Sequence, residues 1–259
     1  MGNEDRVLCG RYVIYTADEL IDLHDIVEEA QRRADAVQGE AQRRADAAQA
    51  SHGKPLLVQT GEIFPTNIAP VLIPSIDAGT ELTPHPLESH PVGRHPLESQ
   101  PLESQPLESQ PLESHPMIWG YPQFGDRKGV VFNTRLETAN EKQYWRDSLV
   151  KRRCVVPMSG FFEWQHGGPS DRQRYLFDLP DEPVLYLAGI YKAFSVPDAV
   201  LANRFSIMTT APNDSMSGVH NRMPVVLLSN EIAQWLYGDP FGFIDRSEIN
   251  LRQQVPVSA

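Results

Sequence analysis

Polar residues interrupt four apolar stretches of this sequence, and three of these stretches carry two polar residues spaced two apart. Residues with this spacing share a face of a β-strand, so each pair would project to the same side. A thiol can act as a nucleophile, an imidazole or a carboxylate can move protons, and a guanidinium group can bind phosphate. The stretches contain Cys9 with Arg11, Asn133 with Arg135, His220 with Arg222, and a single carboxylate, Glu163.

The carboxylate of Glu163 lies in SGFFEWQ, between Phe162 and Trp164. A carboxyl group surrounded by aromatic side chains is expected to have a raised pKa, because burial disfavours its charged form. Such a group suits proton transfer near neutral pH. Two structural alternatives remain open: Glu163 pairs with an arginine, and His220 is a structural histidine whose nitrogens are satisfied by its neighbours.

The two cysteines differ in their surroundings. Cys154 precedes Val155 and Val156, which is typical of a small buried side chain. Cys9 lies so near the start of the chain that it is either an early core residue or a reactive group for which the terminus matters. Two widely separated cysteines provide no disulfide framework, so we expect a reducing, cytoplasmic setting.

The net charge of −11 argues against broad, nonspecific binding to a polyanion. Residues 85–116 hold five glutamates and one arginine, so much of the acidity is local and a basic groove elsewhere is not excluded. No run of about 20 apolar residues is present that could cross a membrane. The first residues do not read as a secretory signal, and we expect no membrane partner.

Short β-branched and aromatic runs, separated by turn residues, dominate the chain outside one helical region. They predict strands over 7–15, 128–135, 154–164, 174–179, 184–194, 204–212 and 223–229. Helices are predicted from Thr16 through the AQRRADA copies at 30–36 and 41–47, over 137–149, and over 230–237 with Ser229 as cap. The pattern predicts an α+β fold: one domain with a curved, barrel-like, mainly antiparallel sheet and flanking helices.

The order of several motifs along the chain resembles that of a known family. CGRY, which begins at Cys9, is followed by NIAP (67–70), WG (119–120), NTRLET, RRCVVPMSGFFEW, AGIY (188–191), MTTAPN (208–213) and HNRMPVVL (220–227). This resembles the SRAP family, the SOS-response-associated peptidases, which are understood as abasic-site processing proteins. The resemblance covers the chain from Cys9 to about residue 245, apart from an insertion.

The resemblance implies a covalent reaction with abasic sites in single-stranded DNA during the SOS response to DNA damage. A ring-opened abasic sugar is an aldehyde, which the free α-amine of an N-terminal cysteine can attack to form a Schiff base. The thiol of the same cysteine can then close a thiazolidine ring and leave a stable DNA–protein cross-link. The resemblance also implies peptidase (hydrolase) and DNA lyase activity, no cofactor or metal, a monomer, and a cytoplasmic protein that joins the nucleoid after damage.

By the same resemblance, each candidate residue receives a role. Cys9 would be the nucleophile, Glu163 would transfer protons, His220 would assist Schiff-base formation, and Asn133 would hydrogen-bond the sugar or the terminal residue. The DNA-binding residues would be Arg11, Arg135 and Arg222 on phosphates, Thr209 on the backbone, and Pro70 and Trp119 stacked on bases beside the lesion.

The eight residues before Cys9 depart from the family's usual start, Met-Cys-Gly-Arg, in which removal of Met exposes the cysteine amine. Three explanations compete. Translation could begin at a non-ATG codon for Leu8, or self-cleavage could remove residues 1–8, or the protein could lack the thiazolidine reaction. We therefore divide the chain into a leader (1–8), an SRAP domain (9–250) interrupted by an insertion (77–116), and a tail (251–259).

The insertion is the second departure from the family. Residues 86–115 are six pentapeptides: PLESH, PVGRH, three copies of PLESQ, and PLESH. A proline at every fifth position is expected to block helix and sheet, and the segment is expected to build no core. Because loop closure costs little even for long insertions, deleting residues 86–115 is expected to leave the fold and cross-linking intact, with equal or tighter DNA binding at low salt.

Two other functions remain compatible with the sequence. One is a cysteine peptidase that uses Cys9 and His220 with Glu163 or Asn133, because these residue types can form a catalytic triad. The other is a noncatalytic reader of single-stranded or modified DNA on the same fold.

Overall fold

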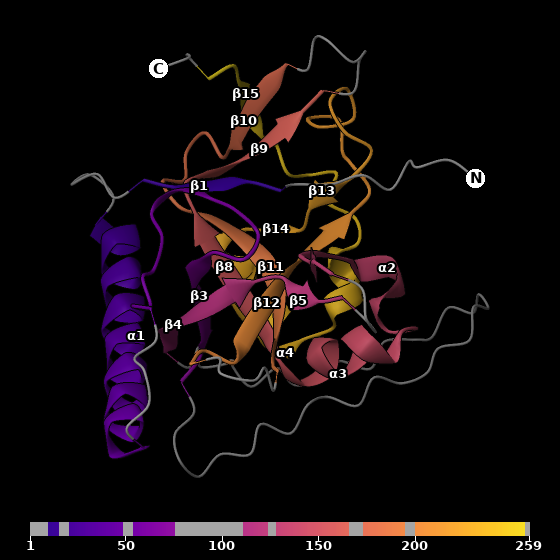
Figure 1. Cartoon of the computed structure of the whole chain (residues 1–259). Helices are drawn as coiled ribbons and strands as arrows, with labels where there is room; N and C mark the ends of the chain where they lie inside the picture. The colour runs from indigo at the N-terminus through magenta and orange to yellow at the C-terminus, as the bar shows by residue number, and fades with distance from the viewer. Residues whose placement is uncertain are drawn as a thin grey trace.

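The described residues form a closed barrel, a second sheet and helices that flank the barrel on different sides (Figure 1). The structure is a computed structural model that describes residues 10–15, 21–48, 54–75, 111–123, 128–165, 173–194 and 200–256. Among these residues, no helix is long and apolar enough to cross a membrane.

Five strands close into the barrel at the centre of the fold. They are β3 (Ile68–Pro74), β4 (Leu112–Trp119), β8 (Arg153–Met158), β11 (Leu185–Ala193) and β12 (Asn203–Thr210). Their order is β12-β4-β3-β8-β11, and β11 also pairs with β12, which closes the ring. All these pairings are antiparallel except that of β4 with β12. The predicted α+β fold with a barrel-like sheet is therefore confirmed.

The second sheet is fully antiparallel and continues from the barrel through β8. Its strands, in spatial order, are β15 (Arg252–Gln254), β10 (Arg174–Asp178), β9 (Gly160–Trp164), β1 (Tyr12–Ile14) and β2 (Gly61–Ile63). The chain bends between β8 and β9 at Ser159, whose amide donates to the Val13 carbonyl oxygen at 2.8 Å. A Cβ at Gly160 would lie 2.8 Å from the Phe177 carbonyl oxygen, so only glycine fits the bend. The single strand predicted over 154–164 is therefore two strands in two sheets.

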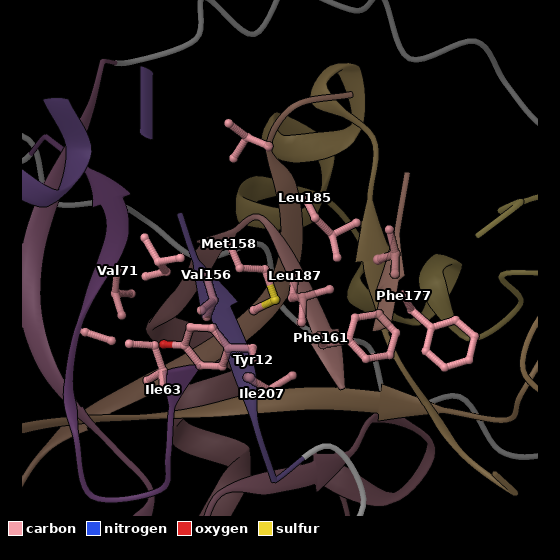
Figure 2. Packing of buried hydrophobic residues seen from close by; sticks show 14 of the residues in the cluster. Tyr12, Ile63, Val71, Val156, Met158, Phe161, Phe177, Leu185, Leu187 and Ile207 are labelled. Carbon is pink, nitrogen blue, oxygen red and sulfur yellow. The ribbon is translucent and has the colours of Figure 1, made fainter. Parts of the chain in front are cut away.

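The main core lies between the barrel and the second sheet, as Figure 2 shows. Tyr12 and Phe161 enter it from the second sheet, and Val156, Leu187 and Ile207 enter it from the barrel. Cys154 is also fully buried in this core, and burial raises the pKa of its thiol well above the ordinary range. This confirms the expectation that Cys154 is a small core side chain rather than a nucleophile.

The long helix α1 (Ile21–Ala48) packs against β3 and β4 (Figure 1). Its apolar stripe is buried at Leu23, Ala30 and Ala34, whereas no described side chain of the second AQRRADA copy is buried. The predicted start at Thr16 lies outside the described residues. The remaining helical elements are α2 (Leu136–Ala139), α3 (Gln143–Lys151), α4 (Ile232–Tyr237), and the 3₁₀ turns η1 (Ser229–Glu231) and η2 (Pro240–Phe243).

Three boundaries differ from those predicted. The helix expected over 137–149 is broken between Ala139 and Gln143, so that α2 and α3 are separate. Ser229 does not cap the last helix: the Leu228 amide precedes the turn and donates to Glu231 Oε2 at 2.8 Å. The expected tail contains β15, which pairs with β10 at the edge of the second sheet.

The last pentapeptide of the insertion is part of the barrel, contrary to the expectation that its prolines block a sheet. Residues 112–116 form the first half of β4 and pair with β3, and Pro116 faces Pro70. Two hydrogen bonds flank this pairing: the Trp119 amide donates to Asn67 O, and the Ser75 amide donates to Pro111 O. Odd-numbered residues of the segment 111–119 therefore direct their backbone polar groups toward β3. The nitrogen of Pro116 therefore points away from β3 and forfeits no bond to it.

Side chains of this pentapeptide also join β4 to helix α1. Ser114 is fully buried, donates to the Ile26 carbonyl oxygen at 2.7 Å, and its amide donates to Glu29 at 3.2 Å. Glu113 pairs with Arg33 at 3.0 Å. The sequence PLESH at 111–115 therefore has a structural role: it joins the barrel to α1.

We expect two deletions of the insertion to behave differently. Removal of residues 86–110 should leave the thermal midpoint nearly unchanged, because loop closure depends only weakly on length. Removal of residues 86–115 also deletes half of β4 and the Ser114 bonds. At about 1 kcal/mol for each of several lost hydrogen bonds, this should lower stability by about 3 kcal/mol and the midpoint by roughly 6–12 °C. Thermal unfolding followed by circular dichroism measures both. Equal midpoints for the two deletions would contradict the structural role of residues 111–115.

Candidate active site

The strand β12 brings two of the predicted site segments together. It runs through the barrel up to Ile207 and then continues between two short strands, β7 (Asn133–Arg135) and β13 (Met223–Pro224). Thr209 is the Cα partner of Arg135 on one side and of Pro224 on the other. The remaining short strands are β5 (Tyr121–Pro122), β6 (Val130–Val131) and β14 (Val226–Leu227).

His220 reaches this place at the end of a turn that precedes β13. The backbone amide of His220 donates to Met216 O at 3.0 Å, and the Arg222 amide donates to His220 Nδ1 at 3.1 Å. Nδ1 also lies 3.3 Å from the Arg222 carbonyl oxygen, so this ring nitrogen is held against the backbone of Arg222. The side chain is 5% exposed. The turn therefore holds the imidazole of His220 in one orientation.

Asn213 holds the turn in place and was not singled out by the sequence analysis, although it lies in the MTTAPN motif. Its Nδ2 donates to the carbonyl oxygens of Arg246 and Ile249 at 2.9 and 2.6 Å, and its Oδ1 accepts from the Ser215 amide at 3.0 Å. An asparagine followed by Asp and Ser is a typical turn signal, so the sequence contained a clue to this role.

The carboxylate of Glu163 belongs to β9 and is only 2% exposed. Residues alternate along β9, so Glu163 and Phe161 project to the core side, whereas Phe162 and Trp164 project to the outer side. Gln165, which follows β9, donates to the Gly218 carbonyl oxygen at 3.4 Å. This contact joins the end of β9 to the turn that carries His220, so Glu163 and His220 lie on adjoining segments.

The first described residues of the chain run along β9 as well. Tyr12 pairs with Phe161, and the Phe162 amide donates to Arg11 O at 2.9 Å. Continuing this antiparallel register places Gly10 opposite Glu163. Cys9, the predicted nucleophile, lies outside the described residues.

A bidentate ion pair between Arg222 and Glu137 closes the site on the side of β7. Arg222 Nη1 and Nη2 donate to the two carboxylate oxygens at 2.6 and 2.7 Å, and Nη2 also donates to Thr209 O at 2.8 Å. Burial alone would raise the pKa of the Glu137 carboxyl, but hydrogen bonds from Arg222 and the charges of Arg222 and Arg135 outweigh it, so this pKa is lowered. Sequence reasoning expected Arg222 on a phosphate and did not identify Glu137.

We expect Glu137→Gln to weaken both stability and the reaction at the site. The change leaves the guanidinium of Arg222 without its charged partner, which should cost about 1–3 kcal/mol. Because the pKa of Glu137 is lowered, the stabilisation is complete above the ordinary carboxyl range and is lost as pH falls through the lowered pKa. Urea unfolding at neutral and acidic pH measures this, and the difference between the proteins should shrink in acid.

A control is available in Glu231, which forms a bidentate ion pair with Arg246 at 2.9 and 2.6 Å and does not pair with Arg222. Glu231→Gln should lower stability by a comparable amount without slowing any reaction that depends on His220. A similar loss of reaction rate in both variants would show that the Glu137 effect is one of general stability.

The predicted base-stacking residues do not lie where a base could reach them. Trp119 is fully buried, its Nε1 donates to Phe132 O at 3.0 Å, and its ring packs against Tyr12 at 4.9 Å between centroids. Pro70 is buried in β3. The structure therefore differs from the expectation for both side chains, because β3 and β4 are barrel strands whose residues fill the core.

The other predicted DNA-binding residues do not all lie at the same site. Thr209 is buried, and its hydroxyl donates to Thr134 O at 3.3 Å. Arg135 is exposed at the end of β7, where α2 begins. Arg11 lies on the second sheet and pairs with Glu62 at 2.9 Å. Among the described residues, no group of His, Cys, Asp and Glu side chains could hold a metal ion.

Proteins with similar sequences support the family resemblance. YoqW of Bacillus subtilis (strain 168), an abasic site processing protein, is 33% identical over 106 residues, which are 41% of this chain and 47% of YoqW. HMCES of Rattus norvegicus, also an abasic site processing protein, is 30% identical over 143 residues, which are 45% of this chain and 40% of HMCES. The chain thus spans about half the length, or less, of these relatives.

A crystal structure of a protein from Bordetella bronchiseptica resembles the fold across 91% of both chains, with a TM-score of 0.52 and 16% identity. The family model described as SOS response associated peptidase (SRAP) matches residues 8–245. Because this match spans nearly the whole chain, the protein belongs to the SRAP family.

Proposed function

We propose that this protein processes abasic sites in single-stranded DNA by a covalent link to Cys9. The observation that carries the proposal is the register of β1 and β9, which opposes Gly10, the neighbour of Cys9, to the buried Glu163. The names of the relatives YoqW and HMCES support the choice of an abasic site as substrate. A role in the SOS response and peptidase or lyase activity belong to the same proposal.

In the proposed reaction, Cys9 supplies both nucleophiles and Glu163 transfers protons. The α-amine of Cys9 attacks the aldehyde carbon of the ring-opened sugar, and loss of one water gives an imine. The thiol then adds to the imine carbon, its proton passes to the nitrogen, and a five-membered ring closes. Glu163 carries protons for sugar ring opening and for the departing water, since a buried carboxyl group can act on either side of the transfer.

In this scheme, His220 and Asn133 form hydrogen bonds with the ring-opened sugar. The imidazole of His220, which the turn before β13 holds in place, donates a hydrogen bond to the oxygen that becomes the departing water. Asn133, on β7 beside β12, hydrogen-bonds the sugar. Arg135, exposed at the end of β7, binds a phosphate of the strand.

The test is incubation with abasic single-stranded DNA followed by a denaturing gel. The proposal expects a slower-migrating band that survives denaturation and is lost in Cys9→Ala. Binding in a native gel without the denatured band would replace the proposal with a noncatalytic DNA reader. Release of a leader peptide without a DNA adduct would replace it with a cysteine peptidase.

A further inference from the structure

The outer face of the second sheet carries two arginines that share one carboxylate. Arg11 Nη1 lies 2.9 Å from Glu62 Oε2, and Arg174 pairs with the other oxygen of Glu62. Arg174 comes from β10 and Glu62 from β2, on either side of β1 and β9. Neither Glu62 nor Arg174 was expected from the sequence to belong to the site.

The register explains why these side chains meet. Arg174 is the Cα partner of Trp164, and Glu62 is the Cα partner of Val13, two residues from Arg11. Side chains of paired residues point to the same face of a sheet, and so do those two apart. The two arginines and Glu62 therefore lie on the face opposite to Glu163, separated from it only by the thickness of β9.

Aromatic rings interleave with these arginines. The Arg11 guanidinium carbon lies 4.3 Å from the centroid of Phe64 and 5.2 Å from that of Trp164. The Arg174 guanidinium carbon lies 3.6 Å from the centroid of Phe162 and 5.7 Å from that of Trp164. Guanidinium groups positioned over the faces of aromatic rings keep their N–H groups available for a planar or tetrahedral anion.

Two guanidinium groups share one carboxylate in this cluster, so Glu62 is the common partner of Arg11 and Arg174 among the described residues. The three side chains are 28–36% exposed, so the ion pairs are screened by solvent and individually weak. A phosphodiester could therefore take the place of the Glu62 carboxylate at modest cost, since guanidinium groups bind phosphate and carboxylate with the same geometry.

The family resemblance already implies that Arg11 binds a phosphate; we propose that Arg174 joins it in a phosphodiester-binding pair, and that the Glu62 carboxylate occupies this pair when no strand is bound. This inference rests on the proposed function, because a strand whose lesion reaches Cys9 would pass Arg11, two residues away. Glu62 then acts as a competitor built into the protein, and Arg174 adds a phosphate contact on β10.

Anisotropy titration of a fluorescent, undamaged oligothymidylate over a range of salt concentrations tests the inference. Glu62→Gln should bind about 3- to 10-fold more tightly at low salt, and the advantage should shrink as salt rises. Arg174→Gln should bind more weakly and should lower the slope of log affinity against log salt by about 1, whereas Arg174→Lys should keep the slope.

A matched control separates a local effect from a general effect of charge. Glu40 pairs with Arg44 on the exposed surface of α1, so Glu40→Gln changes the net charge as Glu62→Gln does. Tightening by Glu62→Gln alone supports the inference, whereas equal tightening by both variants overturns it. Because the strand is undamaged, no effect of Glu62→Gln in a protein that still cross-links abasic DNA would overturn the inference and leave the function standing. Tighter binding by Glu62→Gln in a protein that forms no cross-link would support the inference and overturn the proposed function.

Discussion

Protein that begins at Cys9 is expected to form a stable cross-link with abasic single-stranded DNA, and protein that begins at Met1 or Gly2 is expected to form none. The reaction needs two nucleophiles on one residue, because the imine forms at the α-amine and the thiazolidine closes through the thiol. In a chain that retains residues 1–8, the nitrogen of Cys9 is a peptide amide and cannot form an imine. A cleavable fusion that leaves Cys9 at the terminus supplies the first protein, and intact mass confirms each start.

A second pair of proteins separates the two nucleophiles. Cys9→Ser at the mature terminus keeps the amine and loses the thiol, so it should give an adduct only when borohydride reduces the imine. Cys9→Ala should behave in the same way. Stable adducts of equal yield from the long and the short chain, without reductant, would contradict a requirement for the amine.

Glu163→Gln is expected to slow cross-link formation by about 10²- to 10⁴-fold, the usual contribution of a positioned proton donor or acceptor. The amide has nearly the same size as the carboxyl group, so a side chain that is 2% exposed is replaced without leaving a cavity. It cannot donate or accept a proton in the same way. Single-turnover rates, read as the fraction of DNA in the denatured band over time, measure the change.

The control for Glu163 is a carboxylate on the neighbouring strand. Asp178 on β10 pairs with Arg252 at 2.8 Å at the edge of the same sheet. Asp178→Asn should leave the rate within about twofold, and Glu163→Gln should unfold near the temperature of the parent protein. If Glu163→Gln reacts at the parent rate, Glu163 pairs structurally, which is the alternative that the sequence left open.

Local pattern was enough to predict which residues share a face but not which strands meet. The sequence SGFFEWQ predicts a carboxylate among aromatic side chains; Glu163 is buried, but Phe162 and Trp164 lie on the opposite face of β9. The meeting of Arg11, Glu62 and Arg174 depends on the order β10-β9-β1-β2, which joins residues more than a hundred positions apart. No periodicity within a strand encodes that order.

Two errors came from composition and from analogy. The proline-rich PLESH at 111–115 reads as a segment without structure, yet the register of β4 against β3 lets Pro116 lie where its missing amide forfeits no bond to β3. Trp119 is the last residue of this strand and is fully buried in the core. Both outcomes depend on where the residue lies in the barrel. That position is set by the pairing of β4 with strands that are distant in the sequence.

The central claim is that Cys9, as the terminal residue, bonds to the abasic sugar. The most direct measurement is mass spectrometry of the cross-linked protein after nuclease and protease digestion. The account predicts a sugar–phosphate remnant on the peptide that begins CGR, with a mass equal to the sum of peptide and remnant less one water. A remnant on another residue, or an adduct of undiminished yield in the Cys9→Ala protein, would contradict it.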